Sequence, residues 1–283
     1  MIMKKLLGIV LAAMAAASLT ACSGGSADNT APATASADSS AAETAAADSE
    51  NALQTIKDRG TLIIGTEGNW SPWTYHDESD KLVGFDVEVG QEIAKYLGVE
   101  AKFEEAAWES LLAGVKAGRF DIVCNGVGYT EERAESYEFS DPYVFTRKVL
   151  IVAADNDEIK TFEDLNGKKT SNSSGSTYAE IAQGYGAEVQ YIDTFGETIT
   201  LLTQGRIDAT INSEVSYLDY MTQHPEAPIK IVDQSEGESV CYPVKKGETE
   251  LCEAVNEALA SLRSSGKLAE LSEKYFGGDI TNK

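Results

Sequence analysis

The fold class is decided by the stretch TLIIGTEGNWSPWTYHDESDKLVGFDVEVGQEIAKYLGVEAKFEEAAWESLLAGVKAGRFDIVC, residues 61–124. In it, short apolar runs alternate with longer segments whose apolar residues fall at helical spacing, such as Val89, Ile93 and Leu97. Gly98 follows the first of these segments, where glycine commonly ends a helix. The predicted order is strand, helix, strand, helix, strand, over residues 61–65, 86–97, 101–106, 109–117 and 121–124. This βαβαβ order predicts an α/β fold with parallel strands.

The same alternation restarts further along the chain. Strands are predicted over residues 149–153, 168–171, 189–192, 208–211 and 229–232. Helices are predicted over residues 161–165, 177–183, 197–204, 214–223, 251–262 and 267–275. Two α/β units with trailing helices suggest two lobes. Ligands of such sheets bind at the carboxyl ends of the strands, and these ends can face one cleft between two lobes.

The first fifty residues predict a secretion signal followed by a linker to a membrane anchor. Lys4 and Lys5 precede an apolar run over residues 6–19, which is typical of a secretory signal. The run ends in Leu19-Thr20-Ala21-Cys22, which resembles a bacterial lipobox. We therefore predict a signal peptide over 1–21, a lipid on Cys22 and a disordered linker over 22–50, which would hold an extracytoplasmic domain at the cell membrane. The alternative is an ordinary secretory signal with a chance cysteine.

The charge and the cysteine content argue against several classes of binding partner and of metal site. The formal net charge is −23, from 23 Lys and Arg against 46 Asp and Glu. Such an acidic chain is a poor partner for nucleic acid or for anionic lipid. With Cys22 lipidated, Cys124, Cys241 and Cys252 remain, and the sequence leaves open whether the last two form a disulfide. No spacing of Cys and His indicates a metal site, and nothing indicates a cofactor.

Several short motifs carry a resemblance. From about residue 53 to residue 277, the chain resembles the family 3 extracellular solute-binding proteins, the amino-acid receptors of ABC importers. The matching stretches are Gly65-Thr66-Glu67 through Pro72, Val83-Gly84-Phe85-Asp86, Gly118-Arg119-Phe120-Asp121, Thr130-Glu131-Glu132-Arg133, Phe139-Ser140-Asp141-Pro142-Tyr143, Leu165-Asn166-Gly167-Lys168, Gly175-Ser176-Thr177 and Gly205-Arg206-Ile207-Asp208-Ala209.

The resemblance implies a two-lobed periplasmic-binding-protein fold of type II, a Venus flytrap with two crossover strands as its hinge. Lobe 1 would hold residues 51–143 and 243–283, and lobe 2 residues 149–238. It also implies a function: a monomeric receptor that binds a free amino acid, delivers it to a permease and performs no chemistry. Two other functions stay open. One is a dehydratase acting on a prephenate-type acid, with Glu67 and Glu214 as the candidates for a general acid. The other is the sensor lobe of a receptor.

Arg133 is the first candidate for ligand binding. A carboxylate is best held by a guanidinium fork and backbone N–H groups. The resemblance places the carboxylate clamp on Arg133, with the N–H of Gly128 assisting and the backbone at Gly126 facing the ammonium; Asn125 belongs to the same turn. The alternative is a surface arginine that pairs with Glu132 or Glu135.

The turn at Ser176 and Thr177 is the second candidate. It precedes a predicted helix, whose N-terminal N–H groups are free to bind an anion. The resemblance places this turn on the ligand carboxylate from the second lobe, so that one ligand group would bridge both lobes. The alternative is simple N-capping.

Aromatic side chains are the third candidates for ligand binding. The resemblance places Trp70 against the ligand and Trp108 at an apolar contact, whereas Trp73 is expected to be structural. Glu67 ends the first strand and is predicted to touch the ligand side chain or ammonium; a hinge or surface hydrogen bond is the alternative.

The chain departs from the family where many members have an aspartate for the ligand ammonium. That position is Ser213, and a buried ammonium without a charged partner is costly. Glu214 is the nearest substitute, with Asn212 as a hydrogen-bond acceptor; as an alternative, Glu214 only complements the helix dipole. Because Arg133 is the one basic contact that the sequence suggests, the expected ligand is a neutral polar or sulfur-containing amino acid such as cystine.

Overall fold

The computed structural model describes residues 51–283. The predicted signal peptide, the linker and Cys22 lie outside the described residues. Within 51–283 no helix is long and apolar enough to cross a membrane. Cys124, Cys241 and Cys252 are buried free thiols, so the disulfide that the sequence left open is not formed.

The first sheet has five strands in the order β5-β1-β6-β13-β7. β1 runs parallel to both β5 and β6, whereas β13 is antiparallel to β6 and β7. The bounds are β1 Thr61–Thr66, β5 Glu100–Glu105, β6 Ile122–Val123, β7 Tyr137–Phe139 and β13 Pro243–Lys245. The predicted parallel βαβαβ unit is confirmed here. A separate small sheet, which the sequence did not predict, is formed by β2 Asn69–Trp70, β3 Thr74–His76 and β4 Leu82–Val83.

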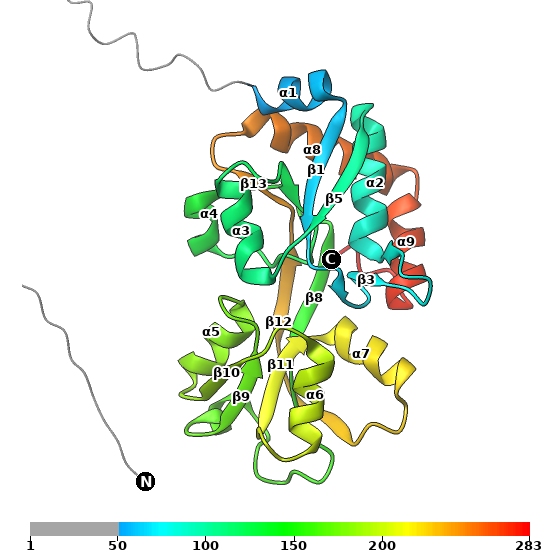
Figure 1. The fold of residues 1–283 in the computed structure, drawn as a ribbon. Helices are drawn as coiled ribbons and strands as arrows, with labels where there is room; N and C mark the ends of the chain where they lie inside the picture. The colour runs from blue at the N-terminus through cyan, green and yellow to red at the C-terminus, as the bar shows by residue number, and fades with distance from the viewer. Residues whose placement is uncertain (1–50) are drawn as a thin grey trace, which may run out of the picture. The chain divides into compact units, whose positions relative to one another are not determined.

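Helices cover both faces of the first sheet (Figure 1). They are α1 Ala52–Arg59, α2 Phe85–Leu97, α3 Trp108–Lys116, α4 Glu131–Ser136, α8 Thr249–Ser264 and α9 Lys267–Phe276. Figure 1 shows α3 and α4 on one side of the sheet and α2 and α9 on the other. The predicted helices at 86–97, 109–117, 251–262 and 267–275 are confirmed to within a few residues. α1 was missed because Ile56 is its one buried residue, which leaves almost no apolar periodicity to detect.

The second sheet has the order β10-β9-β11-β8-β12. β10, β9 and β11 are parallel, and β8 is antiparallel to both β11 and β12. The bounds are β8 Val144–Ala153, β9 Lys169–Asn172, β10 Glu188–Tyr191, β11 Ala209–Ser213 and β12 Ile229–Val240. The helices of this part are η1 Phe162–Leu165, α5 Thr177–Gly184, α6 Phe195–Thr203 and α7 Glu214–Gln223.

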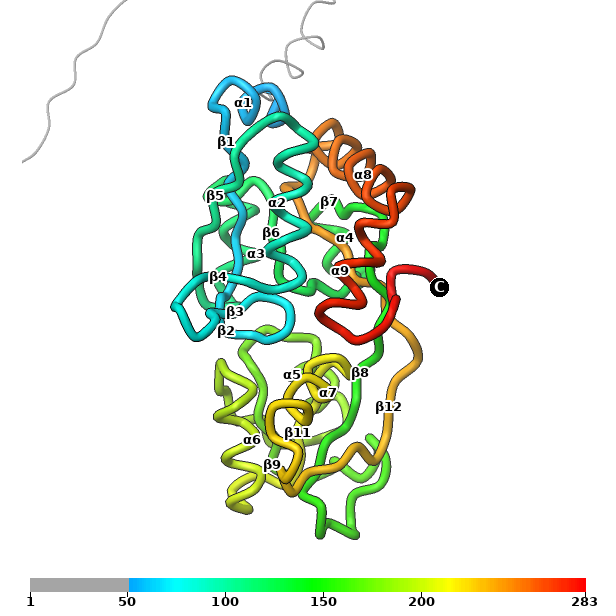
Figure 2. Tube along the Cα trace, turned by 90° about the vertical axis from the view of Figure 1, so that its right-hand side faces the viewer, coloured from blue at the N-terminus to red at the C-terminus, as the bar shows by residue number. Residues whose placement is uncertain are grey.

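Two long strands connect the parts of the molecule that contain the two sheets. β8 and β12 pair along their length, with irregularities near Asp233 and Gln234, and run side by side in both views (Figures 1 and 2). Both are longer than the strands that the apolar runs predict, over 149–153 and 229–232, and they extend toward the crossings that the resemblance implies near 143–149 and 238–244. The extra residues of β12 are mostly polar, and the antiparallel ladder to β8 overrides their weak local signal.

Several apolar clusters pack the two sheets. The largest cluster joins β1 and β6 of the first sheet to α2, α8 and α9, with Trp73, Phe85, Tyr143 and Tyr242 among its buried members. Two smaller clusters lie on the second sheet, one around Leu150 and the other around Ile199. These cores position the carboxyl ends of the parallel strands, where the candidate site lies.

Candidate functional site

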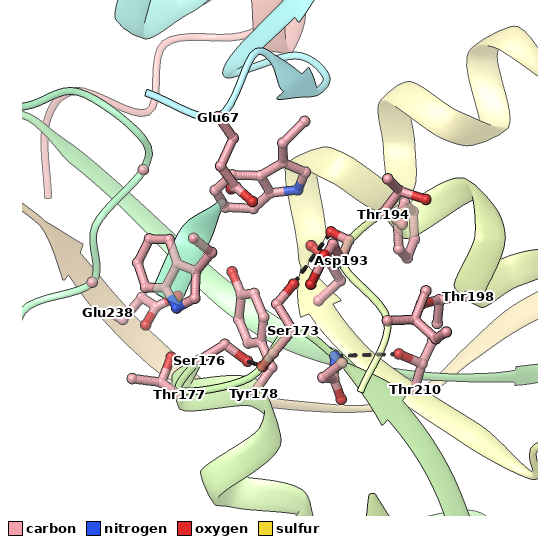
Figure 3. Close-up of a pocket in the computed structure, with 18 of the residues that line it drawn as sticks. Glu67, Ser173, Ser176, Thr177, Tyr178, Asp193, Thr194, Thr198, Thr210 and Glu238 are labelled. Carbon is pink, nitrogen blue, oxygen red and sulfur yellow. Dashed lines mark hydrogen bonds between the residues drawn. The ribbon is translucent and has the colours of Figure 1, made fainter. Parts of the chain in front are cut away.

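A pocket lies at the carboxyl ends of the parallel strands of both sheets (Figure 3). Its walls include Glu67 after β1 and Trp108 at the start of α3, together with Asn172 at the end of β9 and Asp193 shortly after β10. It holds about 630 Å³ of space free of protein atoms, part of it open to solvent. This volume falls in the range of small-molecule sites, about 300–1,000 Å³.

The structure brings most of the predicted binding residues to this pocket. Those that line it are Glu67, Trp70, Trp108, Gly126, Gly128, Arg133, Ser176, Thr177 and Asn212. Asn125, Ser213 and Glu214 are not among the lining residues. The ligand-binding role of each remains a prediction, and the contacts of each residue show what it has to offer.

Arg133 lies in the first turn of α4, whose N-cap Thr130 accepts a hydrogen bond from the Arg133 N–H at 3.1 Å. Its Nη1 donates to the Gly128 carbonyl oxygen at 3.1 Å and its Nη2 to the Gly175 carbonyl oxygen at 3.4 Å. The guanidinium lies 5.4 Å from the Trp108 ring, and burial lowers its pKa. No ion pair joins it to Glu132 or Glu135 in the described chain. A guanidinium has five N–H donors, so donors remain for a carboxylate.

Gly126 packs against the aromatic wall. Its φ of +57° is left-handed, and a Cβ atom there would lie 2.8 Å from the Trp70 ring. Glycine is therefore required for the stack of Trp70 on Trp73, whose ring centroids are 5.6 Å apart. The Gly126 N–H donates to the Asp86 carboxylate at 2.5 Å, which fixes this turn to α2.

Asn125 positions Glu67 and does not itself line the pocket. Its Oδ1 accepts from the Glu67 N–H at 2.8 Å, and its Nδ2 donates to the Glu67 carboxylate at 2.7 Å. Burial raises the pKa of Glu67 to about 7, although the hydrogen bond from Asn125 opposes this shift. Near neutral pH Glu67 is therefore present in both protonation states, able to accept from a cation or to donate a proton.

The start of α5 supplies Ser176 and Thr177. Ser176 is the N-cap: its hydroxyl accepts from the Ala179 N–H at 3.2 Å and donates to the Ser173 carbonyl oxygen at 2.8 Å. Its predicted capping role is confirmed, and this hydroxyl is committed to the protein. Thr177, the first residue of α5, lines the pocket beside it.

The three residues near the predicted ammonium position make other contacts. Ser213 caps α7, and its hydroxyl donates to Ser216 Oγ at 2.9 Å. Glu214 forms an ion pair with Arg147 at 3.1 Å. Asn212 lines the pocket, but its Oδ1 accepts from the Ser213 N–H at 2.8 Å. None of the three thus brings a carboxylate to the pocket wall.

Sequence reasoning missed several lining residues. Among them are the polar residues Asn172, Ser173, Tyr178, Asp193, Thr194, Thr198, Thr210 and Glu238. Many follow strands of the second sheet, so the rule that ligands bind at strand ends offered a signal. Glu238 had none, because it lies within β12, beyond the end of the predicted strand. In residues 51–283 no group of His, Cys, Asp and Glu could hold a metal ion.

Comparison with known proteins gives consistent matches. The family model of bacterial extracellular solute-binding proteins, family 3, matches residues 62–278. A probable amino-acid ABC transporter-binding protein of Haemophilus influenzae is 38% identical over 222 residues, covering 78% of this chain and 86% of the relative. The L-cystine-binding protein TcyA of Bacillus subtilis is 38% identical over 229 residues, covering 80% and 85%.

A solved structure is similar as well. The ancestral amino acid-binding protein AncCDT-1, a precursor of cyclohexadienyl dehydratase, superposes with a TM-score of 0.73 at 31% identity. The match covers 80% of this chain and 99% of that protein. The residues matched by the family model, 62–278, include the residues that line the pocket.

Proposed function

Because the chain belongs to the bacterial extracellular solute-binding proteins of family 3, we propose that it is an extracytoplasmic receptor that binds a free L-amino acid and delivers it to an ABC importer. One observation carries the proposal: a single pocket joins a guanidinium, a helix N-terminus and carboxylates. These are the groups that a zwitterion needs, since its carboxylate seeks cationic and N–H donors and its ammonium seeks an anion.

The ligand carboxylate would bind between Arg133 and the start of α5. Arg133 already donates to Gly175, which lies two residues before Thr177. A carboxylate here would contact α4 on one side and α5 on the other. With lobe 1 at 51–143 and 243–283 and lobe 2 at 149–238, the same ligand group would hold both lobes. Its binding would thereby favour the closed form that docks on the permease.

The rest of the pocket offers hydroxyls, aromatic surface and the carboxylates of Glu67 and Asp193. We propose cystine, a neutral sulfur-containing amino acid whose far end carries a second ammonium, as the first ligand to test. The pocket lining carries the hydroxyls of Ser173, Thr194, Thr198 and Thr210. Trp70 and Trp108 supply apolar surface. The similarity to TcyA, an L-cystine-binding protein, supports the same choice.

The experiment is a ligand panel on the purified protein, refolded after dialysis to remove any bound compound. We expect L-cystine or another neutral L-amino acid to raise the melting temperature and to bind by calorimetry with 1:1 stoichiometry. Sedimentation checks the expected monomer. If no amino acid in the panel binds, the proposal fails.

We also propose that the receptor is tethered through a lipid on Cys22, after removal of residues 1–21. The lipobox-like sequence before Cys22 supports this. In cells fed an alkyne-labelled fatty acid, the full chain is expected to take up the label and to fractionate with membranes. Cys22→Ala is expected to lose both. A labelled Cys22→Ala variant would contradict the assignment.

A dehydratase is the second candidate, because one observation favours it. Glu67 has a pKa of about 7, which suits a general acid, and AncCDT-1 is a precursor of an enzyme of that kind. A protonated Glu67 would give its proton to the departing hydroxyl, which leaves as water, while the ring carboxylate leaves as CO2 and the electron pair of the broken C–C bond completes the aromatic ring. Turnover of prephenate by the native protein, abolished in Glu67→Gln, would establish this function. If the protein does not turn over prephenate but binds an amino acid, the dehydratase is excluded and the receptor function stands.

A further inference from the structure

We propose that Glu238, on the crossover strand β12, is the acidic partner of the ligand's α-ammonium. This inference rests on the proposed amino-acid-binding function and names the residue that completes the zwitterion site. An α-amino acid carries its two charges about 3 Å apart, so the anion that meets the ammonium must lie close to the cation that meets the carboxylate. The question is which carboxylate lies beside Arg133.

Gly128 lies next to both the Arg133 guanidinium and the Glu238 carboxylate. Arg133 Nη1 donates to the Gly128 carbonyl oxygen at 3.1 Å. On the same residue, a Cβ atom would lie 3.1 Å from Glu238 Oε2. The guanidinium and the Glu238 carboxylate therefore flank one glycine, and the carboxylate is among the charges that raise the pKa of Arg133 against the effect of burial. The lack of a side chain at Gly128 leaves the space between them open to a ligand.

The backbone holds Glu238 in this place. Gly128 forms a β-bridge with Val240. The Tyr129 N–H donates to the Ser239 carbonyl oxygen at 2.9 Å, and the Cys241 N–H donates to the Val127 carbonyl oxygen at 3.0 Å. The end of β12 is thus stitched to the glycine-rich turn that precedes Arg133, and the acid and the base of the site are fixed relative to each other.

Lys148, from β8, is the ion-pair partner of Glu238. The two side chains form an ion pair in which they are only 12% and 13% exposed. Lys148 does not line the pocket, so it contacts the carboxylate from behind. A carboxylate offers about four acceptor sites, and one lysine leaves the others for the ligand ammonium. The buried pair is neutral overall, as is a bound zwitterion.

The other acids are placed for other tasks. Glu214 pairs with Arg147 and does not line the pocket. Glu67 is held by Asn125. Figure 3 shows Asp193 and Thr194 on one side of the pocket and Glu238 and Thr177 on the other. Glu67 and Asp193 are therefore left to face the distal part of the ligand.

The test pairs each amino acid with its desamino analogue. L-Cystine is compared with 3,3′-dithiodipropionate, and L-arginine with 5-guanidinopentanoate, by calorimetry on the native protein and on Glu238→Gln. We expect Glu238→Gln to weaken the amino acid about 10- to 100-fold, the range of a charge-assisted hydrogen bond, and to leave the desamino analogue within about twofold. Glu238→Asp, which keeps the charge, is expected to recover part of the loss.

The control breaks a more exposed lysine–glutamate ion pair, which lies away from the pocket. Glu138→Gln removes the ion-pair partner of Lys246, whose Nζ lies 3.5 Å from the Glu138 carboxylate. This variant is expected to bind each amino acid and its desamino analogue with unchanged affinity. Equal weakening of the amino acid and its analogue in Glu238→Gln would overturn the inference, as would an ammonium-specific loss in Glu214→Gln with none in Glu238→Gln. If the native protein binds neither L-cystine nor L-arginine nor any other panel member, the proposed function fails and this inference with it.

Discussion

The regions around the two sheets differ in the kind of side chain that they bury. Nearly all the largest fully buried side chains, among them Trp73, Phe85, Tyr143 and Tyr242, belong to the region of the first sheet, residues 51–143 and 241–283. The region of the second sheet, residues 144–240, buries more small polar side chains than the first region does, among them Thr170, Ser171, Asn172, Thr198, Thr210, Asn212, Ser213 and Ser216.

The difference indicates a division of labour across the pocket. Buried apolar area is the main source of stability, so the first region should form the more stable frame. The second region exchanges part of that stability for hydroxyl and amide groups near the ligand. Four tests of this contrast have expected effects that decrease from Asp86 through Arg133 and Glu67 to a pair of buried threonines.

Asp86→Ala should have the largest effect, because it breaks a hydrogen-bonded polar cluster buried in the core of the first region. Asp86 is fully buried and accepts from Tyr143 Oη at 2.8 Å, from Tyr242 Oη at 2.9 Å and from the Gly126 N–H at 2.5 Å. Removing it leaves three buried donors without an acceptor. We expect a loss of about 3–5 kcal/mol in the free energy of unfolding, measured in urea.

The control for Asp86→Ala is Asp155→Ala, at an exposed site before η1, which should stay within about 0.5 kcal/mol of the native protein. An Asp86→Ala protein as stable as this control would show that the cluster does not support the first region.

Arg133→Ala should act on binding and leave the fold intact. The guanidinium lies at the edge of the first region and contacts backbone carbonyls of both, at Gly128 and Gly175. We expect the amino-acid dissociation constant to rise by two to three powers of ten, about 3–4 kcal/mol, with the urea midpoint nearly unchanged. Arg133→Lys keeps the charge without the fork and should recover part of the affinity. Normal binding by Arg133→Ala would remove the central residue of the proposed site.

These two residues also show how far the sequence leads. Arg133 was predicted for the site from the family resemblance and from a local pattern: a glycine-rich turn, a capping threonine and a short helix lie within ten residues. The role of Asp86 as an acceptor for Tyr143 and Tyr242 has no local signal, since its partners come from positions 57 and 156 residues away. The parallel strands of the first sheet were predicted for the same reason as Arg133, because apolar periodicity is a property of short windows.

The parts that the sequence did not predict depend on long-range pairing. β12 was expected over four residues, yet it continues to Val240 because β8 offers a ladder along its whole length. That continuation brings Glu238 to Gly128, a contact between positions more than a hundred residues apart. Asn125 illustrates the converse: its place in the turn was evident, but its side chain points to Glu67 and the strand end, which local pattern cannot show.

Glu67→Gln tests the charge that the first region presents to the pocket. The pKa of Glu67 rises from an ordinary 4.5 to about 7 on folding, and that of Asp86 from 3.8 to about 6. A raised carboxyl pKa means that the folded state binds more protons than the unfolded state. The stability that these groups contribute is thus fully present below pH 4 and is lost as the pH rises to about 7. Glu67→Gln should remove the upper part of this decline, up to about 3 kcal/mol.

The measurement for Glu67→Gln is the urea midpoint from pH 4 to pH 8. The native curve should fall with increasing pH, and the variant curve should flatten between about pH 5 and pH 7. Parallel curves would show that Glu67 titrates normally and that the pocket does not perturb it.

Thr170→Val and Thr210→Val, a matched pair on adjacent strands of the second sheet, should give the smallest effects, and of opposite sign. Both threonines are fully buried, but the Thr170 hydroxyl has no hydrogen-bond partner, whereas Thr210 Oγ1 donates to the Ser171 carbonyl oxygen at 2.7 Å. Replacing an unpaired hydroxyl with a methyl group should stabilise the protein by about 1 kcal/mol, and replacing a paired one should cost about as much. Thermal unfolding of the two variants measures this difference. If both substitutions stabilised the protein, the buried polar groups of the second region would lower its stability whether or not they are hydrogen-bonded. Ligand binding alone would then account for their presence.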